Sequence, residues 1–212
     1  MTLNAVVDER ALRELYLTGF EIAVKEGRPG ALMTSYNQVN GIQSNENPQL
    51  MLDILRDEWG YDGMVVTDWG GSDDHIRGIQ CRSTLEMPNP GLYAAREVLR
   101  AVERGELSEA EIDLCLKDYF RTLRRAAVQA KKAVPVDPLR QHALARRAAR
   151  ESAVLLKNDG ILPLSGEETV ALIGDFAFMP RYQGAGSSLV NSRRVETLRG
   201  QLSQRLGGKL IG

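Results

Sequence analysis

Two apolar runs in the first third of the chain each end directly before a polar residue. ALMTS, residues 31–35, precedes Tyr36, and GMVVT, residues 63–67, precedes Asp68. Apolar residues without polar alternation are typical of a buried parallel strand. The two runs lie about one strand–helix–strand unit apart. The strands are therefore predicted to be neighbours, with Tyr36 and Asp68 at the same edge of the sheet.

The position of Asp68 at the end of a predicted strand makes it a candidate reactive group. Ligands bind at the carboxyl ends of parallel strands in α/β proteins. The alternative is an aspartate that caps the helix or turn that follows. On this stretch alone, both interpretations stay open.

The whole chain alternates helical and strand patterns, which predicts an α/β fold. Asp8 and Asn47 are predicted helix caps, Gly27 a helix end, and Ser108 with Glu111 a capping box. Helices are expected over residues 9–27, 49–60, 71–80, 91–106, 109–132, 139–152 and 195–206, and strands over 31–35, 63–67, 83–88, 153–158 and 169–174.

A proline-containing segment interrupts this alternation. Pro135 and Pro138 lie in AVPVDP, where no helical or strand period continues. The segment predicts a linker over residues 134–138, between a first domain of residues 1–133 and a second of residues 139–212.

Composition argues against several classes of function. The 27 basic and 28 acidic residues leave a net charge of −1, so no nucleic-acid or membrane partner is expected. The N-terminus lacks the pattern of a signal peptide, and a cytoplasmic location is expected. Cys81 and Cys115 are interpreted as reduced thiols. His75 and His142 lie too far apart to indicate a metal site, and no cofactor is expected.

Four stretches, in this order, resemble signatures of the family 3 glycoside hydrolases of the β-glucosidase type. They are ALMTSYNQVNG, LRDEWGYDGMVVTDWGG, TLEMPNPG and ARRAARESAVLLKNDGILPLS. The resemblance implies a partial (β/α)8 TIM-type barrel over residues 1–133, followed by the start of an α/β/α sandwich over residues 139–212. It further implies a middle segment that lacks the N-terminal half of the barrel and the C-terminal part of the second domain.

The same resemblance implies a retaining mechanism, in which a carboxylate forms a covalent glycosyl-enzyme. Asp68 matches the nucleophile and Tyr36 the tyrosine that supports it. Trp69 and Met33 match residues of the sugar subsite, although a core position is the alternative for both. Ser187, in the glycine-rich loop YQGAGSS, matches a serine that reaches toward the sugar. Such a loop also arises for conformational reasons alone.

Glu86, in LEMP, is a candidate substrate-binding residue, although pairing inside the barrel is its more frequent role. CRSTLEMP departs from the AGLDLEMP usual in the family, because Arg82 replaces a glycine and Thr84 an aspartate. This strand end is expected to be repacked. None of Glu167, Glu168 and Glu196 matches the general acid/base, which is expected outside this chain.

Three functions remain as alternatives. The first is a β-glucosidase-type hydrolase that acts on β-linked glycosides or oligosaccharides, incomplete as this chain, with self-association through exposed barrel edges. The second is a catalytically silent carbohydrate-binding or interaction fragment of the same fold. The third is a nucleotide-binding α/β protein, which only the glycine-rich loop suggests and which the lack of a following lysine disfavours.

Overall fold

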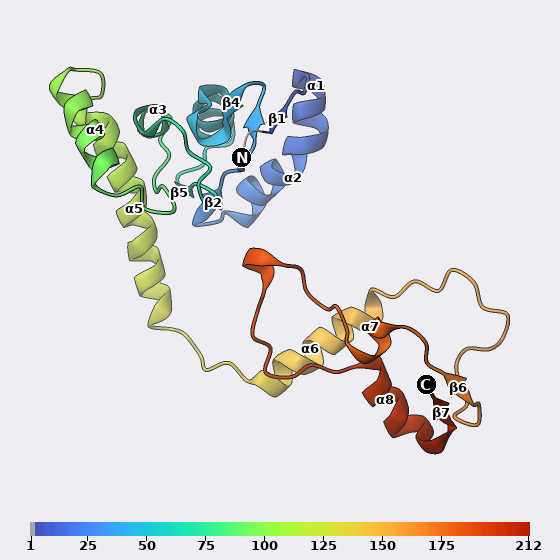
Figure 1. The fold of residues 1–212 in the computed structure, drawn as a ribbon. Helices are drawn as coiled ribbons and strands as arrows, with labels where there is room; N and C mark the ends of the chain where they lie inside the picture. Colours follow the sequence, from blue (N-terminus) through green and yellow to red (C-terminus); the bar gives the residue numbers. More distant parts are fainter. Residues whose placement is uncertain (1–2) are drawn as a thin grey trace. The chain divides into compact units, whose positions relative to one another are not determined.

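The structure, a computed structural model, describes residues 3–212. The chain divides into two compact units, of which the first ends at Pro135 and the second spans Val136–Gly212. This division lies within residues 134–138. Figure 1 shows the elements of each unit.

A long helix covers residues 9–27 at the start of the first unit. The Asp8 carboxylate caps it by accepting a hydrogen bond from the Ala11 N–H at 2.9 Å. The helix ends at Gly27, as predicted, but Arg28 is the residue that takes the left-handed conformation there, with φ 47°. Its segments alternate between α and π hydrogen bonding: α1 (Glu9–Ala11), η1 (Leu12–Leu17), α2 (Thr18–Ile22) and η2 (Ala23–Gly27).

Two parallel strands, β2 (Ala31–Met33) and β5 (Met64–Val66), pair with Leu32 opposite Val65. The pairing confirms that the two predicted strands are neighbours, and Val65 is buried as expected for a parallel strand. The strand predicted at 83–88 is reduced to one parallel bridge between Val66 and Leu85. One reason is that the Thr84 hydroxyl, rather than a main-chain carbonyl, accepts the Val65 N–H at 3.1 Å.

The segment after β2 contains a hairpin that the sequence analysis missed. Strands β3 (Gln38–Val39) and β4 (Ile42–Gln43) pair in antiparallel fashion, and β1 (Asn4–Ala5) adds in parallel to β3. Asn40 and Gly41 connect β3 to β4 with φ values of 51° and 86°. An Asn-Gly pair with positive φ at both positions forms a two-residue hairpin turn. That dipeptide was the available signal.

Helices pack around the two parallel strands. The Leu50 N–H donates to the Asn47 side chain at 3.3 Å, and Ser108 and Glu111 form the predicted capping box. A core of apolar side chains joins the helices to the sheet. Its buried members are Val24, Met51, Leu55, Tyr61, Val65 and Cys81. The helices are η4 (Gln49–Glu58), α3 (His75–Gln80), α4 (Leu92–Glu103) and α5 (Glu109–Ala130).

A buried charge cluster lies beside this core. The Asp118 side chain is fully buried and accepts two hydrogen bonds from the Arg82 guanidinium, at 2.7 and 2.8 Å. Arg56, only 4% exposed, approaches the same carboxylate at 3.4 Å. Arg82 has φ 59°, a conformation that favours glycine, the residue that the resemblance implied at this position. Arg82 is held there by its ion pair with Asp118, and the repacking of this strand end stays a prediction.

The second unit contains short elements around one parallel strand pair. Strands β6 (Val170–Ala171) and β7 (Leu210–Ile211) pair in parallel. β6 is shorter than the strand predicted over 169–174, and β7 was not predicted. The remaining elements are α6 (Pro138–Glu151), α7 (Asp175–Phe178), η5 (Gly186–Ser188), α8 (Leu198–Leu206) and η6 (Gly207–Lys209).

The strand predicted over residues 153–158 is wrong. Val154, Leu155 and Leu156 are 79%, 65% and 92% exposed. Within the described second unit, no strand pairs with them. An apolar run forms a strand only where a neighbour accepts its backbone hydrogen bonds.

None of the helices over residues 3–212 is long and apolar enough to cross a membrane.

Candidate active site

The ends of β2 and β5 bring Tyr36 and Asp68 to the same edge of the sheet. The two strands run in parallel with Met33 opposite Val66, and the Thr34 N–H donates to the Val66 carbonyl at 3.0 Å. After these positions, the backbone of each strand leaves the sheet within two or three residues. The predicted juxtaposition of Tyr36 with Asp68 is therefore confirmed.

Tyr36 and Asp68 are neighbours at this edge. The Asp68 carboxylate beside the Tyr36 hydroxyl raises the pKa of Tyr36, because ionising the phenol would place two negative charges side by side. Asp68 Oδ1 also accepts the Trp69 N–H at 2.8 Å. The Trp69 N–H thus orients the carboxylate at the strand end, and the Tyr36 phenol lies beside it.

Trp69 directly follows Asp68 in the chain, and Met33 is the last residue of β2; both side chains are open. Each is 61% exposed. Both side chains are thus accessible in the described part of the chain, and their roles toward a sugar stay predictions. An exposed indole face next to a carboxylate is suited to contact the C–H face of a sugar ring.

Glu86 is engaged in a pair with a histidine. Glu86 Oε2 lies 2.7 Å from His75 Nδ1, and His75 Nε2 lies 3.8 Å from Glu97 Oε2 on α4. The imidazole thus connects the strand end to two helices. This contact favours the pairing role that the sequence suggested for Glu86 over direct contact with a substrate.

Sequence reasoning missed the importance of residues 44–47. They were expected in a turn-rich loop, yet all four are buried. Glu46 accepts hydrogen bonds from the loop that follows Asp68. No periodicity marks such a turn, since its burial depends on contacts with residues 25 or more positions away.

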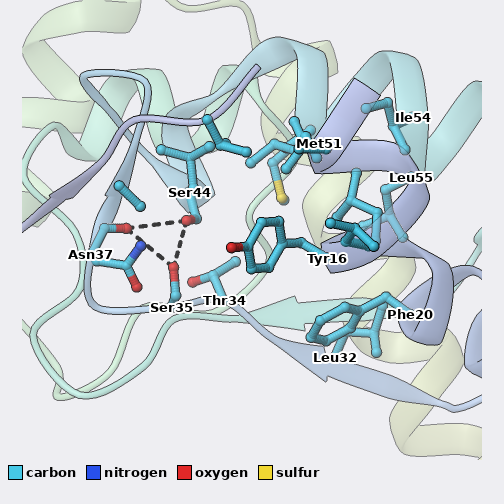
Figure 2. A pocket seen from close by; sticks show the side chains of 18 of the residues that line it. Tyr16, Phe20, Leu32, Thr34, Ser35, Asn37, Ser44, Met51, Ile54 and Leu55 are labelled. Atoms are coloured by element: carbon cyan, nitrogen blue, oxygen red, sulfur yellow. Dashed lines mark hydrogen bonds between the residues drawn. The ribbon is translucent and has the colours of Figure 1, made fainter. Parts of the chain in front are cut away.

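A large groove of the first unit does not include Asp68. It has a volume of about 630 Å³ and lies between the helix at 9–27, strand β2 and helix η4 (Figure 2). Apolar side chains such as Phe20, Leu32 and Leu55 form most of its wall. At one end, Ser35 and Ser44 share a hydrogen bond at 2.6 Å. The groove is an uncovered apolar surface beside the free edge of β2.

Ser187 lies in the second unit, on the short helix η5. The site formed by the ends of β2 and β5 belongs to the first unit, so the role of Ser187 toward the sugar stays a prediction. Residues 3–212 contain no group of three or more His, Cys, Asp or Glu side chains placed to hold a metal ion.

A comparison with known protein families identifies the family to which this site belongs. Residues 2–117 match the glycosyl hydrolase family 3 N terminal domain. The chain belongs to glycosyl hydrolase family 3. The match covers both parallel strands and all residues of the first unit discussed as site candidates.

Two curated members of glycosyl hydrolase family 3 are similar along nearly all of this chain. Thermostable beta-glucosidase B of Acetivibrio thermocellus is 40% identical over 211 residues, 99% of this chain and 28% of that protein. An exo-alpha-(1->6)-L-arabinopyranosidase of Bifidobacterium longum is 36% identical over 97% of this chain and 28% of its own length. The chain thus spans little more than a quarter of these relatives.

A solved structure of glycosyl hydrolase family 3 has the same fold over this region. A β-glucosidase of Kluyveromyces marxianus is 32% identical, with a TM-score of 0.91 over 98% of this chain and 26% of its own. An α/β arrangement like that of the family's barrel domain is therefore shown for the first unit.

Proposed function

We propose that this chain is part of a retaining glycoside hydrolase of the β-glucosidase type, with Asp68 as the nucleophile. The observation that carries the proposal is the placement of Tyr36 beside Asp68 at the ends of two adjacent parallel strands. A reactive carboxylate must be oriented toward the sugar while it remains accessible. Tyr36 and the Trp69 N–H orient Asp68, and the surrounding Trp69 and Met33 side chains are open.

In the proposed reaction, an Asp68 oxygen attacks the anomeric carbon. The glycosidic C–O bond breaks, its electron pair goes to the departing oxygen, and a general acid protonates that oxygen. Water, deprotonated by the same residue, then cleaves the ester and restores Asp68. Such a mechanism requires two carboxyl groups about 5 to 5.5 Å apart.

The second carboxyl group is proposed to come from outside residues 1–212. Glu86 is the nearest candidate along the sheet edge, but its carboxylate is engaged with His75. The much greater length of the relatives leaves ample sequence for an acid/base residue. Ser187 is proposed to reach the sugar from the second domain.

The rest of the fold is likewise proposed to come from outside residues 1–212. β2, β5 and the segment around Leu85 would be consecutive strands of a (β/α)8 TIM-type barrel, with residues 1–133 as its C-terminal part. Residues 134–138 would link it to residues 139–212, the start of an α/β/α sandwich. The first assignment is supported because β5 pairs in parallel with β2 on one side and bridges in parallel to Leu85 on the other. The parallel β6–β7 pair supports the second assignment.

The substrate is proposed to carry a terminal β-D-glucosyl or related residue. The Kluyveromyces marxianus and Thermotoga neapolitana β-glucosidases were solved in complex with glucose. The arabinopyranosidase among the relatives shows that other sugars are handled within the family. The exposed Trp69 face suits a pyranose ring without selecting one sugar.

A chimaera tests the proposal. Residues 1–212 replace the matching segment of the Acetivibrio thermocellus enzyme, and hydrolysis of an aryl β-glucoside and of cellobiose is measured. We expect turnover with retained β configuration, and a loss of several orders of magnitude in Asp68→Asn. A folded chimaera without turnover would favour the alternative, a catalytically silent carbohydrate-binding or interaction fragment.

A further inference from the structure

The loop that carries Asp68 and Trp69 must be held in place by contacts from outside the sheet. It spans residues 68–74 and contains Gly70 at φ 80°, followed by Gly71. Its first half is tied to the strands, because the Gly70 N–H donates to the Met87 carbonyl at 2.8 Å. Its second half, residues 72–74, has no strand beside it.

A single carboxylate binds this second half. Glu46 Oε1 accepts the backbone N–H groups of Asp73 at 2.6 Å and Asp74 at 2.9 Å, and the Ser72 hydroxyl lies at 3.3 Å. In return, Arg77 Nε, on the helix after the loop, donates to the Glu46 carbonyl at 2.9 Å. The loop and the residue that holds it therefore fix each other.

Because Glu46 is charged and buried, it needs the hydrogen-bond donors that the loop supplies. Glu46 is only 5% exposed. In the described part of the chain, no lysine, arginine or histidine forms a salt bridge with it. A buried carboxylate is tolerated only where hydrogen-bond donors satisfy it. The donors here come from residues 72–74, so displacement of the loop would leave Glu46 both buried and unsatisfied.

The turn that carries Glu46 also holds the Tyr36 loop. This turn is η3 (Ser44–Glu46). The Ser44 hydroxyl lies 2.6 Å from the Ser35 hydroxyl and donates to the Asn37 carbonyl at 3.2 Å. These contacts are visible at one end of the groove in Figure 2. Ser35 and Asn37 are the two neighbours of Tyr36, so one buried turn contacts both loops of the candidate site.

We propose that Glu46 is a positioning residue: by binding residues 72–74 it sets the Asp68 loop against the Tyr36 loop. Its relevance to catalysis rests on the proposed function. The effect of Glu46 on the Tyr36–Asp68 contact does not depend on the proposed function. That contact can be measured in the chain itself. Glu46 touches neither Tyr36 nor Asp68, so any change in their contact must be transmitted through the loops.

The readout is the ionisation of Tyr36. The neighbouring Asp68 carboxylate raises the pKa of this phenol. We expect Glu46→Ala to release the Asp68 loop and to shift the Tyr36 pKa back toward that of a free phenol. Tyrosinate absorbance after a pH jump, with the signal of a Tyr36→Phe variant subtracted, reports Tyr36 alone before alkaline unfolding begins.

Glu168→Ala is the matched control. Glu168 also accepts two loop N–H groups, from Ser165 and Gly166, both at 2.9 Å, but it lies in the second unit. Its removal should leave the Tyr36 titration unchanged. Glu46→Gln retains an oxygen that can accept the Asp73 and Asp74 N–H groups, so it should preserve most of the raised pKa.

Two results would overturn the proposal. One is a Glu46→Ala protein that melts cooperatively and titrates at Tyr36 as the parent does. The other is a shift of equal size in Glu168→Ala. If Glu46→Ala does not fold, Glu46→Asp replaces it: the charge is kept but withdrawn by one methylene, and the Tyr36 pKa should again fall. An unchanged Tyr36 pKa in folded Glu46→Asp would equally contradict the positioning role.

Discussion

Asp118→Ala should be among the most destabilising single changes in the first unit. The Asp118 side chain is fully buried on α5 and receives both Arg82 nitrogen donors as well as Arg56. Truncation removes the carboxylate that Arg82, Arg56 and Arg121 share. Arg56 is then left 4% exposed without a carboxylate partner; it keeps the Gly63 carbonyl at 2.7 Å, the Tyr61 carbonyl at 3.1 Å and the Tyr61 ring.

The magnitude follows from burial. Breaking a buried ion pair by removing one partner costs about 3 to 5 kcal/mol, because an uncompensated charge remains. Arg82 is 24% exposed and can regain some hydration, whereas Arg56 cannot. Burial already lowers the pKa of Arg56, and loss of Asp118 would lower it further. We therefore expect about 4 kcal/mol, a large part of the roughly 5 to 15 kcal/mol that stabilises a typical protein.

Urea denaturation followed by tryptophan fluorescence measures this loss. Trp59 packs against the core and reports its unfolding. With a urea m-value of about 2 kcal/mol/M, the midpoint should fall by roughly 2 M. Asp118→Asn should lose less, because it retains an acceptor for Arg82. Asp113→Ala, on the exposed side of the same helix, should change stability by less than about 0.5 kcal/mol. A loss below 1 kcal/mol in Asp118→Ala would refute the reasoning.

Four further expectations concern the site and the surface of the chain. In the active chimaera, Tyr36→Phe should lower kcat by roughly tenfold or more, measured at saturating substrate. Since the pKa of Tyr36 is raised, its phenol should stay protonated through the ordinary phenol pKa of 10.0 and ionise only at higher pH, which a pH–rate profile tests. The isolated chain should self-associate through the groove and the free edge of β2, and Phe20→Glu should reduce the mass seen by sedimentation; a monomeric parent would argue against this. Alone, the chain should not hydrolyse cellobiose, because loss of a general acid typically costs about 10²- to 10⁴-fold; turnover that disappears in Asp68→Asn would point to an acid within residues 1–212.

The parts of the fold that sequence predicted are those fixed by local signals. The long helix over 9–27, the capping box at Ser108 and the strand pair ending near Tyr36 and Asp68 each follow from caps and apolar runs. The strand predicted at 153–158 was wrong, because a strand needs a partner as well as an apolar sequence. The hairpin at Asn40-Gly41 was missed although its turn residues are diagnostic.

The candidate site divides in a similar way. Asp68 and Tyr36 were identified because each follows an apolar run, and the contact between them follows from the parallel register. The partnership of Glu86 with His75 and the grip of Glu46 on residues 72–74 depend on tertiary packing alone. Residues that orient a site from outside leave no spacing rule in the sequence, since their partners lie on unrelated elements.

The most direct test of the central claim is the site of covalent labelling. The active chimaera is incubated with a 2-deoxy-2-fluoro-β-glucosyl fluoride, whose glycosyl-enzyme is hydrolysed slowly, and the peptides are analysed by mass spectrometry. We expect one fluoroglucosyl group, attached to Asp68 and absent from Asp68→Asn. Labelling of another carboxylate instead of Asp68, with loss of activity in proportion to the label, would contradict the assignment of Asp68 as the nucleophile.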